Sequence, residues 1–376
     1  MSPTALVIGG TGPTGPFVVE GLAERGYAVT ILHGGQHEVD FAVDGIRHIH
    51  ADPHFTETLE DGLGDETFDL VVAQYGRLKV TAEVLRGRTD RLIAVGGATA
   101  IYAGDADARW GRVGKPALFP ESEPILAVEG GSSLESKIGS KMVEAMNVLF
   151  RNSRKGEYSA TYVGYPLNYG PRNPGPYDWA IVRRILDGRR QIVVADGGIK
   201  LESRILSENA AQSVLLVVDE PEKSAGKRYS VADRYTFTMR QRIEFIARCM
   251  GVEVELIDLP YPLAWPCHPY WRGVRGHRVC DSSLIRHELA YEDTVESDEG
   301  FGSSIEWLIA HPPEGGGEAE RQVGDQFDYD REDDLIRNWS KLEGELDTAA
   351  PEEFVAGHQY RHPKTPGEVW KPKGSE

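Results

Sequence analysis

The sequence contains few cysteines, no excess of positive charge and no long apolar run. Its three cysteines, Cys249, Cys267 and Cys280, lack the spacing of a metal-ligand pair, which fits a reducing compartment and disfavours a disulfide framework. With 59 acidic residues against 41 Lys and Arg, the net charge of −18 disfavours nucleic acid or an anionic membrane as a partner. No apolar stretch reaches about 18 residues, and no signal peptide precedes the first apolar segment, so we expect no membrane span and a cytoplasmic protein.

Three glycines near the start, Gly9, Gly12 and Gly15, recur at every third position. They follow an apolar run at 5–8 and precede a segment with helical spacing at 17–22, which predicts a strand, a tight turn and a helix. This spacing is typical of a turn that holds a dinucleotide diphosphate, and the alternative is a glycine-rich turn that binds nothing. The candidate cofactor-binding residues of the turn are Gly9, Thr11, Gly12, Pro13, Thr14 and Gly15.

Apolar runs of strand length alternate with helical segments through the first half of the chain. This alternation predicts an α/β fold with a doubly wound parallel sheet and right-handed crossovers. The predicted strands lie at 5–8, 27–32, 46–50, 68–73, 91–95 and 159–164, and a helix is predicted from about 133 to 150.

The second half is less regular and predicts a smaller C-terminal substrate lobe that covers the cofactor cleft. Helices are expected at 179–186, 208–218, 239–250 and 301–309, with strands at 191–194 and 254–259. We therefore divide the chain into a dinucleotide-binding core at 1–172, to which some later segments return, a part at 173–313 that is mainly lobe, and an acidic arm at 314–376. The arm keeps large aromatic residues such as Trp339 and Trp370, so we expect it to pack on its own body or on a neighbouring subunit; a disordered end is the alternative.

Several motifs occur in an order that points to one family. Asp52 follows the third predicted strand, Ser140-Lys141 lies on the helix after a long loop, and Tyr165-Pro166 followed by Tyr169 to Arg172 comes after the sixth strand. Together with the glycine turn, these motifs resemble the extended short-chain dehydrogenase/reductases of the NAD-dependent epimerase/dehydratase type over roughly residues 4 to 313. The resemblance implies a Rossmann fold, a nicotinamide cofactor and a homodimer.

The resemblance also implies roles for individual residues. Asp52 would meet the adenine end of the cofactor, and Lys141 would hold the nicotinamide ribose. Further candidate cofactor contacts are His33, Tyr75, Gly76, Tyr165 and Pro166. At the end of the second strand there is neither the acid that recognises the ribose of NAD nor the arginine that recognises the phosphate of NADP. We expect NAD or NADP, with NAD slightly favoured; His33 and His37 are alternatively plain surface histidines.

The chain departs from the family at two catalytic positions. The family places a tyrosine four residues before the lysine, where the lysine lowers the pKa of the phenol; here that position is Lys137. If Ile101-Tyr102 matches the family's Val-Tyr, the family's serine is replaced by Ala98. The candidate catalytic residues are therefore Lys137 and Lys141, with Thr99, Tyr102 or Tyr75 as sources of the missing hydroxyl.

Three functions remain open after these replacements. The first is an NAD(P)-dependent oxidoreductase acting on a small hydroxy or carbonyl compound, with Lys137 as the proton donor. The second retains the cofactor and catalyses epimerisation, elimination or isomerisation, with Lys137 as the base. The third binds a dinucleotide without turnover, and Lys137 is then a solvated lysine on an exposed helix face.

The candidate substrate contacts lie on loops after the predicted strands and in the lobe. Most of them are arginines, which suit an anionic substrate. They are Arg77, Tyr169, Arg172, Arg204 and Arg272. The alternatives are a polar loop that caps a helix, for Arg77, and a packed core of the lobe, for the aromatic segment around Arg272. We predict no metal site, because the side chains of adjacent Cys267 and His268 would point apart on an extended chain.

Overall fold

The structure is a computed structural model that describes residues 2–35, 39–98, 117–119, 121, 134–264, 267, 276–346 and 365–368. Residues 1–332 form one compact unit and residues 333–376 a second. The boundaries predicted at residues 172 and 313 both lie inside the first unit. Within the described residues, no helix combines the length and the apolar composition that a membrane crossing requires.

A seven-stranded sheet forms the centre of the first unit, with the strand order β12-β7-β5-β4-β1-β2-β3. Each described pair of neighbouring strands runs parallel. The strands are β1 (Thr4–Ile8), β2 (Ala28–His33), β3 (Arg47–His50), β4 (Phe68–Ala73), β5 (Thr89–Gly97), β7 (Ser159–Tyr165) and β12 (Arg228–Ser230). The order reverses direction between β1 and β4, which makes this the topological switch point where ligands of such sheets bind.

The six predicted core strands are confirmed. Five of them are buried apolar runs bounded by turn residues, whereas β3 is largely exposed and is held by its parallel pairing with β2. Strand β1 is almost wholly buried on both faces, as parallel strands covered by helices are. The edge strand β12 was not predicted. It contains three residues, too few to show any periodicity.

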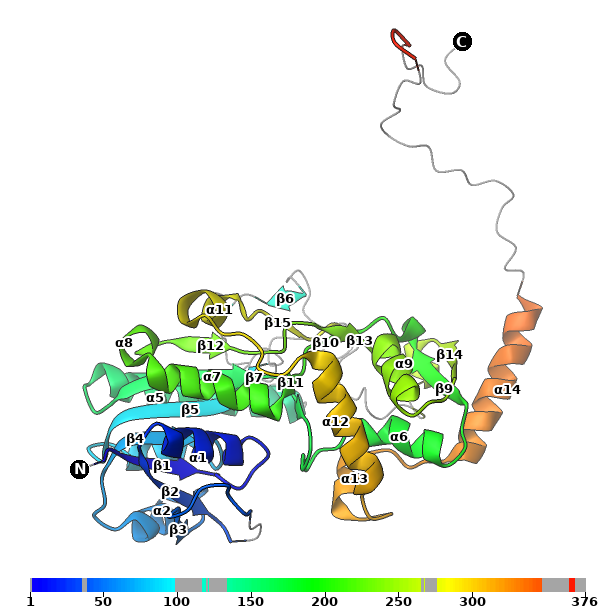
Figure 1. Cartoon of the computed structure of the whole chain (residues 1–376). Helices are drawn as coiled ribbons and strands as arrows, with labels where there is room; N and C mark the ends of the chain where they lie inside the picture. Colours follow the sequence, from blue (N-terminus) through cyan, green and yellow to red (C-terminus); the bar gives the residue numbers. More distant parts are fainter. Residues whose placement is uncertain are drawn as a thin grey trace. The chain divides into compact units, whose positions relative to one another are not determined.

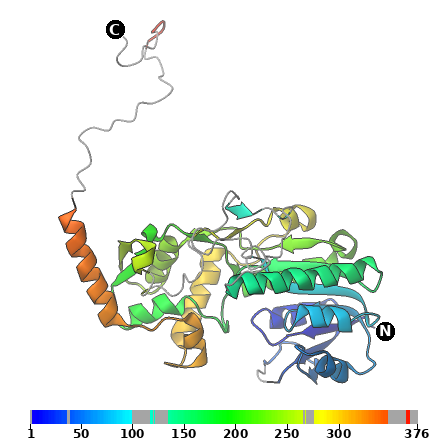
Figure 2. The same ribbon diagram turned by 180° about the vertical axis from the view of Figure 1, so that it is seen from behind.

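Helices cover both faces of the sheet. Residues of α1 and α7 pack with Val7, Ile31 and Val72 on one face, and residues of α2, α3 and α5 pack with Leu6 and Val71 on the other. Figures 1 and 2 show these two layers from opposite sides. The helices are α1 (Gly15–Glu24), α2 (Thr56–Leu63), α3 (Leu78–Val84), α5 (Leu134–Arg154), α7 (Ser207–Asp219), α8 (Pro221–Ser224) and α11 (Ser283–Leu289).

A second hydrophobic cluster, built around Trp179, Ile243 and Ile305, holds the elements that we call the lobe. In it, β9 pairs with β14 in parallel. The lobe contains α6 (Trp179–Leu186), β9 (Gln191–Ala195), the 3-10 turn η1 (Asp196–Gly198), α9 (Met239–Cys249), β14 (Glu255–Leu259), α10 (Tyr261–Ala264), α12 (Ser297–Ala310) and α13 (Glu318–Val323). The helices predicted at 179–186, 239–250 and 301–309 and the strands at 191–194 and 254–259 are thereby confirmed, whereas the helix predicted for the lobe at 208–218 is α7, which packs on the sheet.

Short strands and one long helix complete the described elements. They are β6 (Leu118–Phe119), β8 (Asn168–Tyr169), β10 (Leu201–Glu202), β11 (Ile205–Leu206), β13 (Phe237–Thr238), β15 (Val279–Cys280) and α14 (Tyr329–Glu345). Helices α13 and α14 fall in the segment that the sequence identified only as an acidic arm. Helix α13 has only six residues, and the apolar residues of α14, Leu335, Ile336, Trp339 and Leu342, do have helical spacing, which an interpretation based on acidic composition overlooked.

Candidate functional site

The glycine turn lies at the switch point, between the end of β1 and the start of α1. Gly9 has a φ of +90°, and a Cβ on it would lie 2.4 Å from the Cβ of Tyr75. A Cβ on Gly15 would lie 2.2 Å from the carbonyl oxygen of Gly10. Both positions therefore require glycine for the chain's own packing.

Gly12 differs from its two companions. A Cβ on it would meet only the carbonyl oxygen of Gly9, at an ordinary contact distance of 3.7 Å, and its φ is not in the left-handed region. The fold leaves room for a side chain at this position. What glycine adds there is bare backbone on an open surface, flanked by half-buried Thr11 and Pro13, that a ligand can approach closely.

The N-terminus of α1 has the properties of an anion site. No side chain caps it, Pro16 stands in its first turn, and its first turn contains no acidic residue. The helix dipole therefore presents positive charge that no acidic side chain of the first turn compensates, while the N–H of Gly15 donates to the carbonyl of Gly12 at 2.9 Å and Pro16 has no N–H.

Side chains from the start of α1 and from two strand ends meet behind the turn. The Thr14 hydroxyl donates to Oε1 of Gln74, which directly follows β4, at 2.8 Å. Thr14 is also hydrogen-bonded to the hydroxyl of Tyr165 at the end of β7, whose pKa burial raises to about 12. Pro166, next in the chain, is buried.

One polar atom of this group makes no hydrogen bond within the described part of the chain. The Nε2 amide of Gln74 is buried and has no hydrogen-bond partner among the described residues. A buried donor without an acceptor costs free energy, about 1–3 kcal/mol by mutational measures, and a bound ligand with an oxygen at this point would remove that cost. Gln74 was not among the sequence candidates; its only signal was its place, just after a buried strand and before Tyr75.

Asp52, which was expected at the adenine end, lies next to the end of β3, and His54 connects it to Tyr75. The backbone N–H and the ring of His54 hydrogen-bond to Oδ1 of Asp52 at 2.9 and 2.7 Å, and hold the pKa of Asp52 below its usual range. The exposed ring of Tyr75 meets the ring of His54 edge-on, with centroids 5.0 Å apart. Gly76 has a φ of +93° and packs on Pro53.

Arg77 shares this location. Its guanidinium lies 4.9 Å from the centre of the Phe55 ring, and its backbone N–H donates to Pro53. It was predicted as a substrate contact. The structure places it near Asp52, and not with the substrate candidates Tyr169 and Arg204.

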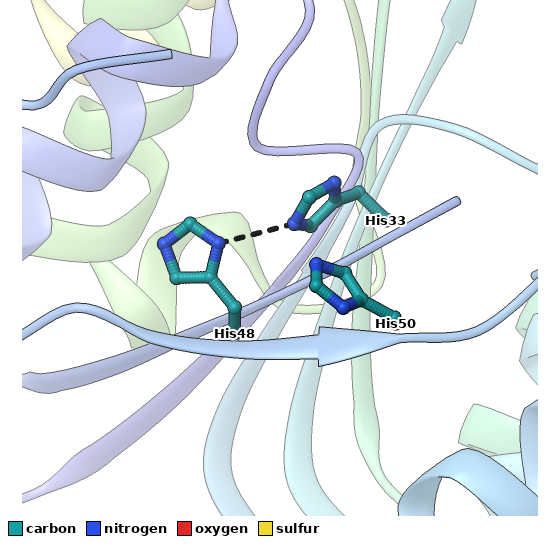
Figure 3. Close-up of side chains that lie close together, drawn as sticks. All are labelled: His33, His48 and His50. Atoms are coloured by element: carbon teal, nitrogen blue, oxygen red, sulfur yellow. Dashed lines mark hydrogen bonds between the residues drawn. The ribbon is translucent and has the colours of Figure 1, made fainter. Parts of the chain in front are cut away.

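His33, the last residue of β2, is buried beside two histidines of β3 that the sequence analysis did not consider. Its Nε2 lies 3.1 Å from Nδ1 of His48, and His50 completes a group whose ligand atoms all lie within 4.8 Å of one another. Figure 3 shows the three rings gathered at the ends of the two strands. The available signal was the His-x-His pattern, which places both side chains on one face of a strand.

Of the catalytic candidates, the structure describes the two lysines. Lys137 and Lys141 lie one turn apart on α5, and both are exposed. Ala98, at the position assigned to the family's serine, is fully buried against Ala232 and Cys280. Thr99 and Tyr102 lie outside the described residues, as do His37 and the whole loop from 99 to 116.

Two further substrate candidates, Tyr169 and Arg172, lie against helix α12 of the lobe. Tyr169 is buried, donates from its hydroxyl to Asp233 at 2.7 Å and stacks on Phe301. Arg172 is exposed, with a φ of +62°, and its guanidinium lies 5.9 Å from the Trp307 ring. Arg272 lies outside the described residues.

Arg204 belongs to a buried group of charges that includes residues the sequence analysis missed. Its Nη2 donates to Glu202 at 2.8 Å. Although burial opposes the ionisation of Glu202, the charges of Arg204 and Lys200 lower its pKa to about 2. Burial lowers the pKa of Lys200 to about 8. Nη2 of Arg278 is buried without a hydrogen-bond partner among the described residues. Positive charge is in excess here, which suits an anionic ligand.

A cavity of about 260 Å³ opens beside this group. Lys200, His277 and Asp196 contribute its polar groups. Nδ1 of His277 accepts from the backbone N–H of Leu201 at 3.0 Å, so the neutral ring carries its proton on Nε2. The other lining residues are mainly apolar: Val194, Ala195, Gly198, Ile199, Met239, Tyr261 and Gly276. Such a mixture is usual for a small-molecule pocket.

Comparison with known proteins yields likeness in structure only. No protein-family model and no curated protein matches the sequence. A dTDP-glucose 4,6-dehydratase from Bacillus anthracis, in complex with NAD, superposes with a TM-score of 0.62 at 14% identity and covers 83% of this chain and 98% of its own. A UDP-glucose 4-epimerase from Thermotoga maritima, with UDP-glucose, has a TM-score of 0.61 at 18% identity, covering 82% and 99%. DesIV, a dTDP-glucose 4,6-dehydratase from Streptomyces venezuelae with NAD bound, has 0.61 at 17%, covering 82% and 97%.

The chain has the Rossmann fold of these proteins. The neighbours are dehydratases and epimerases, the enzyme types that the sequence resemblance names, but identities of 14 to 18% establish the fold alone. Nearly the whole length of each neighbour is matched, so the lobe as well as the sheet is shared. Activity, cofactor and substrate have to be argued from this chain's own residues.

Proposed function

We propose that the chain binds a nicotinamide dinucleotide, with its diphosphate against the turn at Gly9, Gly12 and Gly15. The supporting observation is the open surface at Gly12, where packing permits a side chain and the sequence has none. The unpartnered Nε2 of Gln74 and the uncapped start of α1 offer hydrogen bonds and positive charge around the same turn.

The positions of the other candidate residues in the fold suggest which part of the cofactor each would contact. Asp52 and Tyr75 would lie along the adenosine, while Tyr165 and Pro166, at the end of β7, would lie toward the nicotinamide. Lys141 would hold the nicotinamide ribose, as the family resemblance implies. The end of β2 carries His33, neither an acid nor an arginine, so the proposal covers both NAD and NADP, with NAD slightly favoured.

The reaction that we propose is oxidation or reduction of a small hydroxy or carbonyl compound. A bound nicotinamide supplies hydride transfer, and the chain's own part is to orient the substrate and to move a proton. Lys137 is the proton carrier: as an ammonium it donates to the oxygen of a carbonyl being reduced, and as an amine it accepts the proton of an alcohol being oxidised. Thr99 or Tyr102 would supply the hydroxyl that Ala98 lacks, because Tyr75 lies against His54 beside Asp52.

The lobe suggests that the substrate carries an anionic group. Three positive side chains, Arg204, Lys200 and Arg278, act on the carboxylate of Glu202, so positive charge is in excess among these described residues. An anion at this point would give the buried Nη2 of Arg278 an acceptor. The cavity beside Lys200 has the volume of a small organic molecule.

A second candidate is epimerisation or dehydration with the cofactor retained. It is favoured by the solved structures that share both the sheet and the lobe, which are dehydratases and epimerases, one of them with UDP-glucose. In this case Lys137 acts as the base. A third candidate, binding without turnover, is favoured by the replacement of the family's tyrosine and serine by Lys137 and Ala98.

Binding is tested by titrating the protein with NADH and with NADPH and following the nicotinamide fluorescence. Gly12→Ala should weaken binding tenfold or more, because its Cβ would occupy the surface that the diphosphate approaches. Its free energy of unfolding should stay within about 0.5 kcal/mol of the wild type, since the fold has room for that Cβ. Gly302→Ala is the matched control, because a Cβ there meets no atom within 4 Å. It should leave the affinity for NADH unchanged, and it should raise the free energy of unfolding by about 0.5–1 kcal/mol because Gly302 lies inside α12. Equal affinities of Gly12→Ala and the wild type would refute the proposed site.

Turnover is tested with a screen of hydroxy acids, sugar phosphates and nucleotide sugars, using Lys137→Ala beside Lys155→Ala as a lysine control on the loop after α5. Loss of a positioned acid or base lowers kcat by about 10²–10⁴-fold. A change in absorbance at the nicotinamide band identifies net redox chemistry, whereas product formation without that change identifies the second candidate. If the protein binds the dinucleotide but forms no product from any substrate, and Lys137→Ala has no effect, the third candidate, binding without turnover, is supported.

A further inference from the structure

The three histidines beside the glycine turn share one face of the sheet. His48 and His50 are two residues apart on β3, so their side chains point the same way. His50 is the parallel register partner of His33, and His48 is the partner of Ile31, which is two residues before His33 on β2. The backbone therefore directs all three rings to the face that α1 covers, since Ile31 packs in the cluster of α1.

The spacing of the nitrogen atoms fits a metal ion. Nε2 of His33 and Nδ1 of His48 are 3.1 Å apart, and each ring offers a nitrogen within 4.8 Å of the others. Two imidazole nitrogens that bind one tetrahedral zinc at about 2.0–2.1 Å lie roughly 3.3 Å from each other. The ring nitrogens of His33 and His48 already have about this separation. Rotation of the exposed His50 ring brings its nitrogen to a similar distance from them.

We propose that His33, His48 and His50 form a binding site for a divalent transition metal of the zinc class. Neutral imidazole is the ligand that zinc, nickel and copper share, and hard cations such as magnesium prefer oxygen ligands. His33 is buried and fixes one ligand in the sheet, while His48 and His50 are exposed. The site thus has three protein ligands and an open side, where water or a ligand oxygen completes the coordination.

Metal binding also changes a hydrogen bond of the neighbouring loop. In the metal-free protein Nδ1 of His33 accepts from the backbone N–H of Gly35 at 3.3 Å, so the neutral ring carries its proton on Nε2, which donates to His48. When Nε2 binds a metal, the proton resides on Nδ1 instead, and the N–H of Gly35 loses its acceptor. No net proton is released from a neutral ring, and the exchange replaces one long hydrogen bond by a metal–nitrogen bond.

The site adjoins the turn, because the backbone N–H of Gly9 donates to the carbonyl of Leu32, the residue before His33, at 2.9 Å. If the dinucleotide binds as proposed above, the metal stands at the end of β2, where folds of this kind place the residue that recognises the ribose. The metal site itself does not depend on that proposal, since it rests on the histidines alone.

The test uses the full chain without an affinity tag, freed of metal with a chelator, and contains no nucleotide. Co²⁺ is titrated by visible absorption and Zn²⁺ by calorimetry. We expect one equivalent to bind, with the intense visible bands of a tetrahedral cobalt site.

The variants His48→Gln and His50→Gln decide the assignment. Both side chains are exposed, so the fold should tolerate the changes, whereas His33 is buried and is left intact. Each should weaken binding of the first equivalent at least tenfold, while His287→Gln, an exposed histidine on α11, should match the wild type. The proposal is overturned if no single equivalent binds, or if His48→Gln and His50→Gln bind as the wild type does. Neither result bears on NADH binding, which is measured separately.

Discussion

The glycine turn, at the C-terminal end of a central strand, and the lobe differ in how they use polar groups. At the glycine turn, polar contacts are few and the site is shaped by what glycine leaves open, as at Gly12. In the lobe, charged side chains are buried in pairs: Arg242 with Asp178 at 2.7 Å, and Arg204 with Glu202 at 2.8 Å. The first region depends on backbone shape, and the second on charge balance, so different substitutions should damage them.

Arg184 shows the dependence on charge most strongly. Its guanidinium is buried, donates to Glu332 from Nε at 2.9 Å and to Asp325 at 2.5 Å, and ties the segment after α13 to α6. Replacing a buried member of such a group leaves the partner charges without compensation.

The largest expected effect is therefore that of Arg184→Ala, which should lower the free energy of unfolding by about 3–5 kcal/mol. Urea denaturation measures it. Arg86→Ala is the control, because Arg86 pairs with Glu157 on the surface, where such pairs contribute about 0–1 kcal/mol. Similar losses of unfolding free energy in Arg184→Ala and Arg86→Ala would contradict the view that the lobe depends on its buried charges.

In the turn, Gly15→Ala should lower the free energy of unfolding by about 1–3 kcal/mol, because the new Cβ overlaps the backbone of Gly10, which cannot move as a side chain can. Denaturation of Gly15→Ala beside Gly12→Ala measures the difference within one turn. Equal stability of the two variants would contradict the distinction between Gly15, which packing requires, and Gly12, which faces the ligand.

A pH effect is expected from Lys200 in the lobe. Burial lowers its pKa to about 8, below the value of about 10.4 in an unfolded chain. Between these values the unfolded chain binds more protons, so stability from this group rises with pH in that window and is at its minimum below pH 8. Lys200→Met should raise the free energy of unfolding by about 1–2 kcal/mol at pH 7 and remove the rise, as denaturation at pH 7 and pH 10 would show. An unchanged rise in the variant would exclude Lys200 as its source.

The smallest effect concerns the helix ends. The Thr238 hydroxyl and the Gln241 side chain close the N-terminus of α9 in a capping box, whereas no side chain caps α1. Thr238→Ala should cost about 1 kcal/mol, and Thr238→Ser should restore most of it. A neutral Thr238→Ala would show that the capped end contributes no more than the open one.

Much of the fold could be predicted because its signals are local. The buried strands of the sheet are short apolar runs, and the turn is marked by glycines that the backbone needs at Gly9 and Gly15. Asp52 and Tyr75 were chosen as cofactor contacts because each lies two residues after a strand, and their roles stay predictions. The edge strand β12 was missed because three residues carry too little periodicity, and helices α13 and α14 were missed because their segment was interpreted from its acidic composition.

The catalytic question was framed by the sequence and stays a proposal. Lys137 and Lys141 do lie one turn apart on α5, as their spacing requires, and both are exposed. Their relation to a substrate depends on the loop that contains Thr99 and Tyr102, which lies outside the described residues. The nucleotide titration and the Lys137→Ala assay are the measurements that decide it.

The sequence by itself determined the parallel sheet and the glycine turn, because hydrophobic period and backbone conformation act over a few neighbouring residues. Only the tertiary structure decided which polar groups meet. Arg184 finds Glu332 148 positions along the chain, Thr14 finds Gln74 60 positions along, and His33 finds His48 15 positions along. These partners are selected by strand order and packing, which bring distant segments to one place, and no local pattern records that choice.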